Sequence, residues 1–223
     1  MKDIVFAVNV LYSGAARMLP DVESLSDPEG LEAALTDIAS TAAEFADRVT
    51  DGISYYCRLN AELAGPRAGF LYSRSTTDTS YRQIDTTDLS LYESGDSHIR
   101  WYELAADSDG PLWVEPYDSP IGNDLIISYE IPWRSADGTF IGVVGFDMSF
   151  SSLLRTLENV VSYESGFAGL VSADGTQLYI TADGAVSVTA WWTASESSWQ
   201  SPRRKRSAMS SSATSPSITP GKR

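Results

Sequence analysis

The chain has 223 residues, 43% of them hydrophobic and 11% aromatic, which is enough for one large or two small globular domains with a sizeable core. Its formal net charge of -14 argues against a nucleic-acid partner and against a polybasic membrane-surface anchor, because both need a basic face. The single cysteine, Cys57, excludes an intrachain disulfide, and the single histidine, His98, excludes most metal and acid–base constellations.

Two helices are predicted in the first 50 residues. Residues 4–19 form one, which ends near Pro20. The second has "SDPEG" at its start, which offers Ser26 or Asp27 as a cap and Pro28 as the first helical residue. Its apolar residues recur at steps of three and four and so share one face: Leu31, Leu35, Ile38, Ala42, Phe45 and Val49. No stretch approaches the ~20 apolar residues of a membrane-spanning helix, although residues 4–12 would suit the outer end of one.

The texture then changes to short aromatic and β-branched runs. "RSADGT" carries an Asp-Gly turn signal, so residues 125–133 and 139–150 are predicted as adjacent antiparallel strands. "SADGT" repeats this pattern between residues 167–171 and 177–180. The segment between the two hairpins spaces its leucines and valines as one helical face. A helical region followed by antiparallel strands predicts an α+β fold.

The last forty residues, 184–223, differ in composition from the rest. They hold fifteen Ser or Thr, six Lys or Arg and a single acid, Glu196, so this tail carries about +5 while residues 1–183 carry about -19. Such a segment cannot bury a core, and it is predicted to be disordered. Its "RRKR" run is interpreted as an isolated basic stretch of a low-complexity tail, such as the end of a truncated gene.

The residues from 92 to 150 contain the candidate site. A pocket for a small zwitterion needs a cation, a carboxylate and aromatic walls. Arg100 and Asp147 supply the two charges, and five aromatic residues with polar tips supply the walls: Trp101, Tyr102, Trp113, Tyr117 and Tyr129. The alternative is that these aromatic residues form core and rim, while Asp147 caps a turn or pairs with Arg100. No cofactor or metal motif is present in the sequence.

"WYELA", "GPLWVEPY" and "LIISYEIPWRSADGTFIGVVGFDMSFSSLL" occur in this order, and together they resemble the double Cache (dCache) sensor domains. Upstream, "ISYYCRLNAELAGPRAGFLYSR" and "TTDLSLY" resemble the subgroup found in bacterial transmembrane signalling proteins. In that subgroup the domain precedes a diguanylate cyclase, a histidine kinase or a chemotaxis signalling module. The resemblance covers residues 30–180.

The resemblance implies two stacked PAS-like modules behind a long N-terminal helix, on the extracytoplasmic side of the cell membrane. The domains would be a helical region at 1–50, a membrane-distal Cache module at 51–150, a helix and the first hairpin of an incomplete proximal module at 151–183, and the tail. The distal module would bind the ligand, with Asp147 on its amine and with Trp101 and Tyr117 at pocket positions. Amino-acid-binding members carry an arginine two residues before the tryptophan, where this chain has Ile99 and places Arg100 next to the tryptophan.

Three hypotheses about function follow. The first is a sensor module that binds a small organic ligand such as an amino acid or an amine. The second is a structural module that senses through a partner protein and pairs as a homodimer through its N-terminal helix. The third, an enzyme, has no coherent catalytic set behind it, so the chain is predicted not to be one.

Overall fold

The computed structural model describes residues 2–75, 77–119, 125–160, 169–171, 177–182 and 185–186. Two long helices come first, α1 (Lys2–Met18) and α2 (Pro28–Ala46), joined through the short 3₁₀ helix η1 (Glu23–Leu25). Both predicted helices are therefore confirmed. The second begins at Pro28 as expected, but it ends at Ala46, so that Val49 lies in the turn beyond it.

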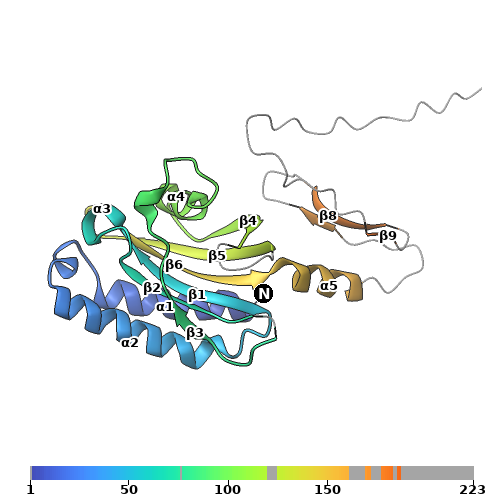
Figure 1. The fold of residues 1–223 in the computed structure, drawn as a ribbon, viewed down its shortest axis with the longest axis horizontal. Coiled ribbons are helices and arrows are strands. Elements are labelled where there is room, and N and C mark those ends of the chain that lie inside the picture. Colours follow the sequence, from blue (N-terminus) through green and yellow to red (C-terminus); the bar gives the residue numbers. More distant parts are fainter. Residues whose placement is uncertain are drawn as a thin grey trace, which may run out of the picture. The chain divides into compact units, whose positions relative to one another are not determined.

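Six antiparallel strands form the main sheet, in the order β3-β2-β1-β6-β5-β4 (Figure 1). Their bounds are β1 (Gly52–Leu59), β2 (Gly69–Ser73), β3 (Arg82–Ile84), β4 (Leu112–Asp118), β5 (Leu125–Arg134) and β6 (Phe140–Ser149). Between them lie α3 (Ala61–Ala64), η2 (Leu89–Leu91) and α4 (Arg100–Asp107). The α+β prediction is confirmed.

The predicted hairpin at residues 125–150 joins β5 to β6. Its turn is closed by hydrogen bonds from the Ser135 amide to the Thr139 carbonyl and from the Gly138 amide to the Ser135 carbonyl, both 2.9 Å. Gly138 has φ of +89°, a conformation that favours glycine, and this explains the Asp-Gly signal. Pro132 is tolerated inside β5 because the pairing with β4 stops at Glu130, so no partner on that side needs its missing amide hydrogen.

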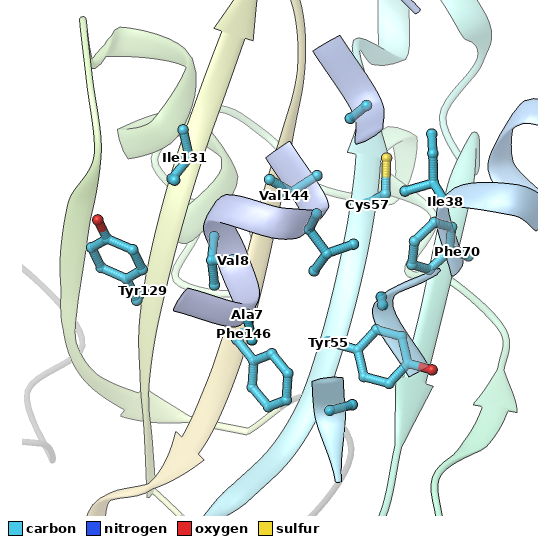
Figure 2. Packing of buried hydrophobic residues seen from close by; sticks show 14 of the residues in the cluster. Ala7, Val8, Ile38, Tyr55, Cys57, Phe70, Tyr129, Ile131, Val144 and Phe146 are labelled. Carbon is cyan, nitrogen blue, oxygen red and sulfur yellow. The ribbon is translucent and has the colours of Figure 1, made fainter. Parts of the chain in front are cut away.

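One face of the sheet packs against α1 and α2, as Figures 1 and 2 show. Alternate residues of β1, Tyr55, Cys57 and Leu59, enter this cluster together with Val144 and Phe146 of β6. The apolar stripe predicted for α2 serves this same cluster: Ile38 and Ala42 are buried in it, and Leu31, Leu35 and Phe45 pack against it. Pairing of two copies through this helix stays a prediction, and it would have to use the outer face.

The second face of the sheet lies under α4. A smaller apolar cluster forms there from Tyr56, Trp101, Ala105, Phe140, Val143 and a few neighbours. Because both faces are covered, all ten residues of β6 are buried, and its sequence reads as a continuous run rather than an alternation. β6 then passes into α5 (Phe150–Val160) with no residue between them.

A second, three-stranded sheet consists of β7 (Gly169–Val171), β8 (Gln177–Ala182) and β9 (Ala185–Val186). The predicted pairing of residues 169–171 with 177–180 is present, while the turn at 172–176 lies outside the described residues. Ala185 and Val186, which fall in the predicted disordered tail, pair with β8. The rest of that tail lies outside the described residues, and no helix within them is long and apolar enough to cross a membrane.

Cys57 is a packed core residue, as predicted, with none of its surface exposed. Burial raises the pKa of its thiol to about 12. Since only the thiolate reacts with disulfide reagents, we expect Ellman's reagent at pH 8 to modify Cys57 no faster than the protein unfolds. The reaction rate should rise with urea in step with the loss of structure seen by circular dichroism. Rapid labelling of the native chain would contradict this packing.

Candidate functional site

The second face of the sheet carries polar groups where β1, β6 and β5 lie side by side. The strand register sets them in rows across the three strands. One row is Ser54, Asp147 and Ser128, and the next is Tyr56, Gly145 and Glu130. A third row on this face begins with Arg58 of β1. Side chains that alternate along a strand share a face at every second position, so the strand that supplies Tyr55 and Cys57 to the helix side supplies Ser54, Tyr56 and Arg58 to this one.

Asp147 lies at the centre of the first row. It is buried, and both flanking serines donate hydrogen bonds to it: Ser54 to Oδ2, and Ser128 to Oδ1 at 2.6 Å. Ser128 is in turn 2.9 Å from the hydroxyl of Tyr117. Burial raises the pKa of the Asp147 carboxyl to about 6, with the two serine hydrogen bonds opposing the shift. Asp147 neither caps a turn nor pairs with Arg100.

Glu130 is a second buried carboxyl group, one row away. Tyr56 donates its hydroxyl hydrogen to Glu130 Oε1 at 2.5 Å. Burial raises the pKa of Glu130 well above its ordinary value, with the charge of Asp147 as a smaller cause. Burial thus disfavours the charged form of Glu130 relative to an exposed glutamate.

Gly145 makes the Tyr56–Glu130 contact possible. A Cβ atom at this position would lie 2.4 Å from the Tyr56 ring. The ring of Tyr56 therefore lies directly over Gly145 of β6, and its hydroxyl group reaches Glu130 on the next strand, β5. The same ring meets Trp101 of α4 edge to face, with 5.2 Å between centroids.

A cavity of about 30 Å³ opens over this face. Its lining comes from the strands, from α4 and from the segment before η2: Tyr56, Arg58, Leu71, Thr86, Thr87, Trp101, Tyr117 and Asp147. This volume accommodates a few water molecules. Any larger ligand must displace part of the lining.

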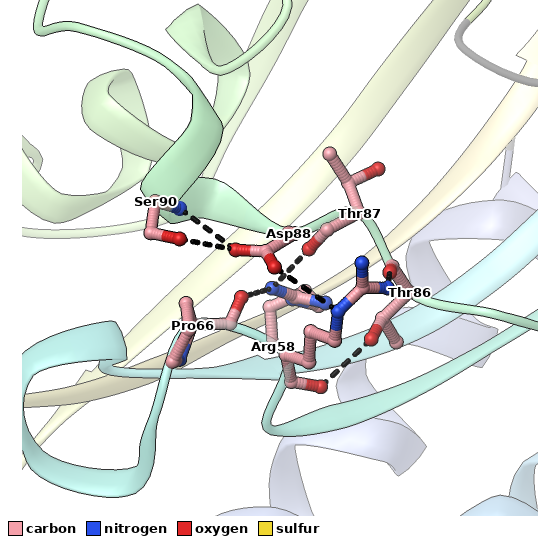
Figure 3. Close-up of polar contacts among 7 residues, drawn as sticks. Arg58, Pro66, Thr86, Thr87, Asp88 and Ser90 are labelled. Carbon is pink, nitrogen blue, oxygen red and sulfur yellow. Dashed lines mark hydrogen bonds and ion pairs between the residues drawn. The ribbon is translucent and has the colours of Figure 1, made fainter.

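Arg58 is one of the lining residues, and Figure 3 shows its polar contacts. Its Nη2 donates to the carbonyl oxygens of Pro66 at 2.8 Å and Thr87 at 2.9 Å. Arg67, nearby on the surface, holds the same segment through Thr86 and Asp88.

The predicted site residues divide into three groups. The structure brings Trp101, Tyr117 and Asp147 together at the cavity. Trp113 and Tyr129 lie on the opposite face, in or against the cluster under the helices, with their ring centroids 4.9 Å apart (Figure 2 labels Tyr129).

The remaining two predicted residues lie on α4, outside the cavity lining. Tyr102 packs beside the cavity, where its hydroxyl accepts from the Ala61 amide and donates to the Leu59 carbonyl. Arg100 is exposed at the first position of α4. Arg100 therefore takes no part in the cavity wall.

Sequence reasoning missed Ser54, Tyr56, Arg58, Ser128 and Glu130. Arg58 stands in "ISYYCRLN", a run that reads as apolar. The available signal was the strand period itself, because a strand with Tyr55, Cys57 and Leu59 on one face must place Arg58 on the other. Within the described ranges, no group of three or more His, Cys, Asp or Glu residues gathers that could hold a metal ion.

Comparison with known proteins identifies the relatives of this chain. A family model described as the first PDC sensor domain of methyl-accepting chemotaxis-like proteins matches residues 40–155. The methyl-accepting chemotaxis protein PctB of Pseudomonas aeruginosa is 30% identical over 117 residues, which are 52% of this chain. This chain spans only 18% of the length of that relative.

Among solved structures, the sensory domain of the Campylobacter jejuni chemoreceptor Tlp3 with isoleucine bound is 16% identical, with a TM-score of 0.49. The match covers 74% of this chain and 57% of that domain. The ligand-binding domain of the same receptor with L-valine matches over the same shares, with the same identity and TM-score.

Substituting Gly145 tests the packing of Tyr56. Gly145→Ala adds a methyl group 2.4 Å from the Tyr56 ring and so displaces it. We expect the free energy of unfolding to fall by roughly 1–3 kcal/mol, as for other overpacked cores. Gly110→Ala is the matched control, since nothing lies within 4 Å of a Cβ there. Urea denaturation measures both, and equal stability of the two variants would contradict the contact.

The raised pKa of Asp147 predicts a pH-dependent stability. Because the folded pKa of about 6 exceeds the ordinary 3.8, protonation stabilises the fold. The contribution is complete below pH 3.8 and is lost as the pH rises through 6. Relative to Asp147→Asn, the wild type should therefore gain roughly 2 kcal/mol between pH 7 and pH 4. Urea denaturation across this range gives the difference, and a difference independent of pH would refute the assignment.

Proposed function

The chain belongs to the family of methyl-accepting chemotaxis-like first PDC sensor domains, and from this premise we propose that it binds a small organic ligand in the cavity above β1 and β6. The ligand carries an amino group, as an amino acid or an amine does, and Asp147 pairs with that group. The module acts as the non-catalytic, extracytoplasmic sensor part of a transmembrane receptor.

The observation that carries this proposal is that Asp147 is buried without a cationic partner among the described residues. It is a buried carboxyl group in the wall of a cavity, and the hydrogen bonds that it receives from the described residues come from hydroxyl groups. Among the described residues, no lysine, arginine or histidine forms an ion pair with it. A buried carboxylate without a cation is costly. A ligand ammonium group would supply the missing charge and lower the pKa of Asp147.

The walls of the cavity suit a cation as well. Tyr56, Trp101 and Tyr117 line it beside Asp147. The face of an aromatic ring attracts an ammonium group, most strongly in the case of tryptophan and in a site shielded from water. The carboxyl group and the rings therefore favour the same kind of ligand.

Ligand entry requires the lining to open, because the cavity now accommodates only a few water molecules. The segment with Thr86 and Thr87 has no helix or strand of its own and forms one wall. Binding would favour conformations in which this wall has moved. A receptor that reports its ligand uses such a shift between two populated states.

A thermal-shift screen of the full chain tests this function. The panel contains L-amino acids, simple amines, carboxylic acids and purines. A ligand at one hundred times its dissociation constant should stabilise the fold by ~2.7 kcal/mol. Asp147→Asn should abolish the shift for amine-bearing ligands, whereas Asp118→Asn, at an exposed aspartate of β4, should leave it unchanged.

A folded chain that no compound of this panel stabilises would refute direct ligand binding. Stabilisation by carboxylic acids alone, unaffected by Asp147→Asn, would refute the role of Asp147.

A further inference from the structure

Arg58 is a buried cation with unused hydrogen-bonding capacity. Only 3% of the surface of Arg58 is exposed. In the described part of the chain, four side-chain atoms are buried without a hydrogen-bond partner: Arg58 Nε, Arg58 Nη1, Tyr81 Oη and Glu130 Oε2. Two of them belong to this guanidinium group. Its remaining nitrogen, Nη2, is held by the carbonyl oxygens of Pro66 and Thr87 (Figure 3).

No carboxylate of the described chain pairs with Arg58. The ion pairs found there join Arg67 to Asp88, Arg82 to Asp78 and His98 to Asp96. Asp88, which Figure 3 shows close by, is occupied by Arg67 and Ser90. A buried arginine is rare unless it is paired, and the unpaired charge is costly. Burial accordingly lowers the pKa of Arg58 to about 10, which still leaves the group charged at neutral pH.

Arg58 of β1 and Asp147 of β6 reach the cavity from different positions along the sheet. Asp147 is the cross-strand partner of Ser54, and Arg58 lies four residues further along the strand. At ~3.3 Å per residue these two positions are roughly 13 Å apart. Tyr56 stands between them and lines the same cavity. A positive and a negative group therefore face one cavity across an aromatic wall.

We propose that Arg58 is the anion-binding residue of this cavity, and that it donates to the carboxylate of a zwitterionic ligand whose ammonium group pairs with Asp147. This inference rests on the proposed function and narrows it, because an amine without a carboxylate would leave the Nε and Nη1 donors unused. It assigns to β1 the role that the sequence suggested for Arg100, which is exposed on α4.

The test compares each L-amino acid with the amine that lacks only its carboxylate, for example L-leucine with 3-methylbutylamine, by isothermal titration calorimetry. Wild-type protein should bind the amino acid at least ~10-fold more tightly, as expected for hydrogen bonds between charged groups. Arg58→Met should remove this preference, weakening the amino acid at least ~10-fold while changing the amine by no more than ~2-fold.

Arg67→Met is the matched control. Arg67 anchors the same segment, through Thr86 and Asp88, but it does not line the cavity. This variant should therefore keep the preference of the wild type, whereas a purely structural role of Arg58 would shift both ligands together. If Arg58→Met does not fold, Arg58→Lys keeps the charge with different donors, and the preference should then fall without vanishing.

Three outcomes would overturn the inference. Equal binding of amino acid and amine by the wild type would do so without any variant. A preference that survives in folded Arg58→Met or is unchanged in Arg58→Lys would do so as well, while the proposed function would stand. Binding of neither ligand class to the wild type would overturn both proposals together.

Discussion

The pleat of three neighbouring strands is the constraint on which the rest of this structure depends. β1, β6 and β5 must each serve two faces at once. The face toward α1 and α2 is apolar and holds Tyr55, Cys57 and Phe146. The other face holds Ser54, Asp147 and Ser128 in one row. Because side chains alternate strictly along a strand, a shift of one residue in this register would exchange the two sets. The strand register that packs the sheet against the helices is therefore the same register that assembles the polar site.

Burying the polar groups of this face costs desolvation free energy, and hydrogen bonds within the protein offset only part of that cost. Asp147 receives two serine hydroxyl groups, and Glu130 receives the hydroxyl of Tyr56. Glu130 Oε2 and two nitrogens of Arg58 remain buried without partners in the described chain. Unpaired groups of this kind cost more in a medium of low dielectric constant than in water. Of these two residues, Arg58 lines the small cavity and Glu130 is bonded to Tyr56, another residue of its lining, so a polar molecule would gain most by binding there.

Much of the fold could be predicted from local sequence alone. The Asp-Gly turn before Thr139 and the helical spacing of Ile38 and Ala42 are both patterns that involve residues only a few positions apart. The placement of Asp147 beside Ser54 could not be predicted in this way, because 93 residues separate them. Trp113 and Tyr129 were grouped with the site by their aromatic character. Which face of the sheet each side chain lies on depends on how the strands pair. The pairing of β4 with β5 contains an irregularity between Val114 and Tyr117, and composition does not reveal it.

The direct passage from β6 into α5 has a mechanical consequence. Only Met148 and Ser149 separate Asp147 from Phe150, the first residue of the helix. A loop at this point would absorb small displacements, whereas a strand that becomes a helix within one peptide bond leaves no slack. A movement of Asp147 by a fraction of an ångström along β6 would therefore reach the base of α5 as a tilt or a rotation. The absence of a loop between Ser149 and Phe150 thus ties the position of the carboxyl group to that of the helix.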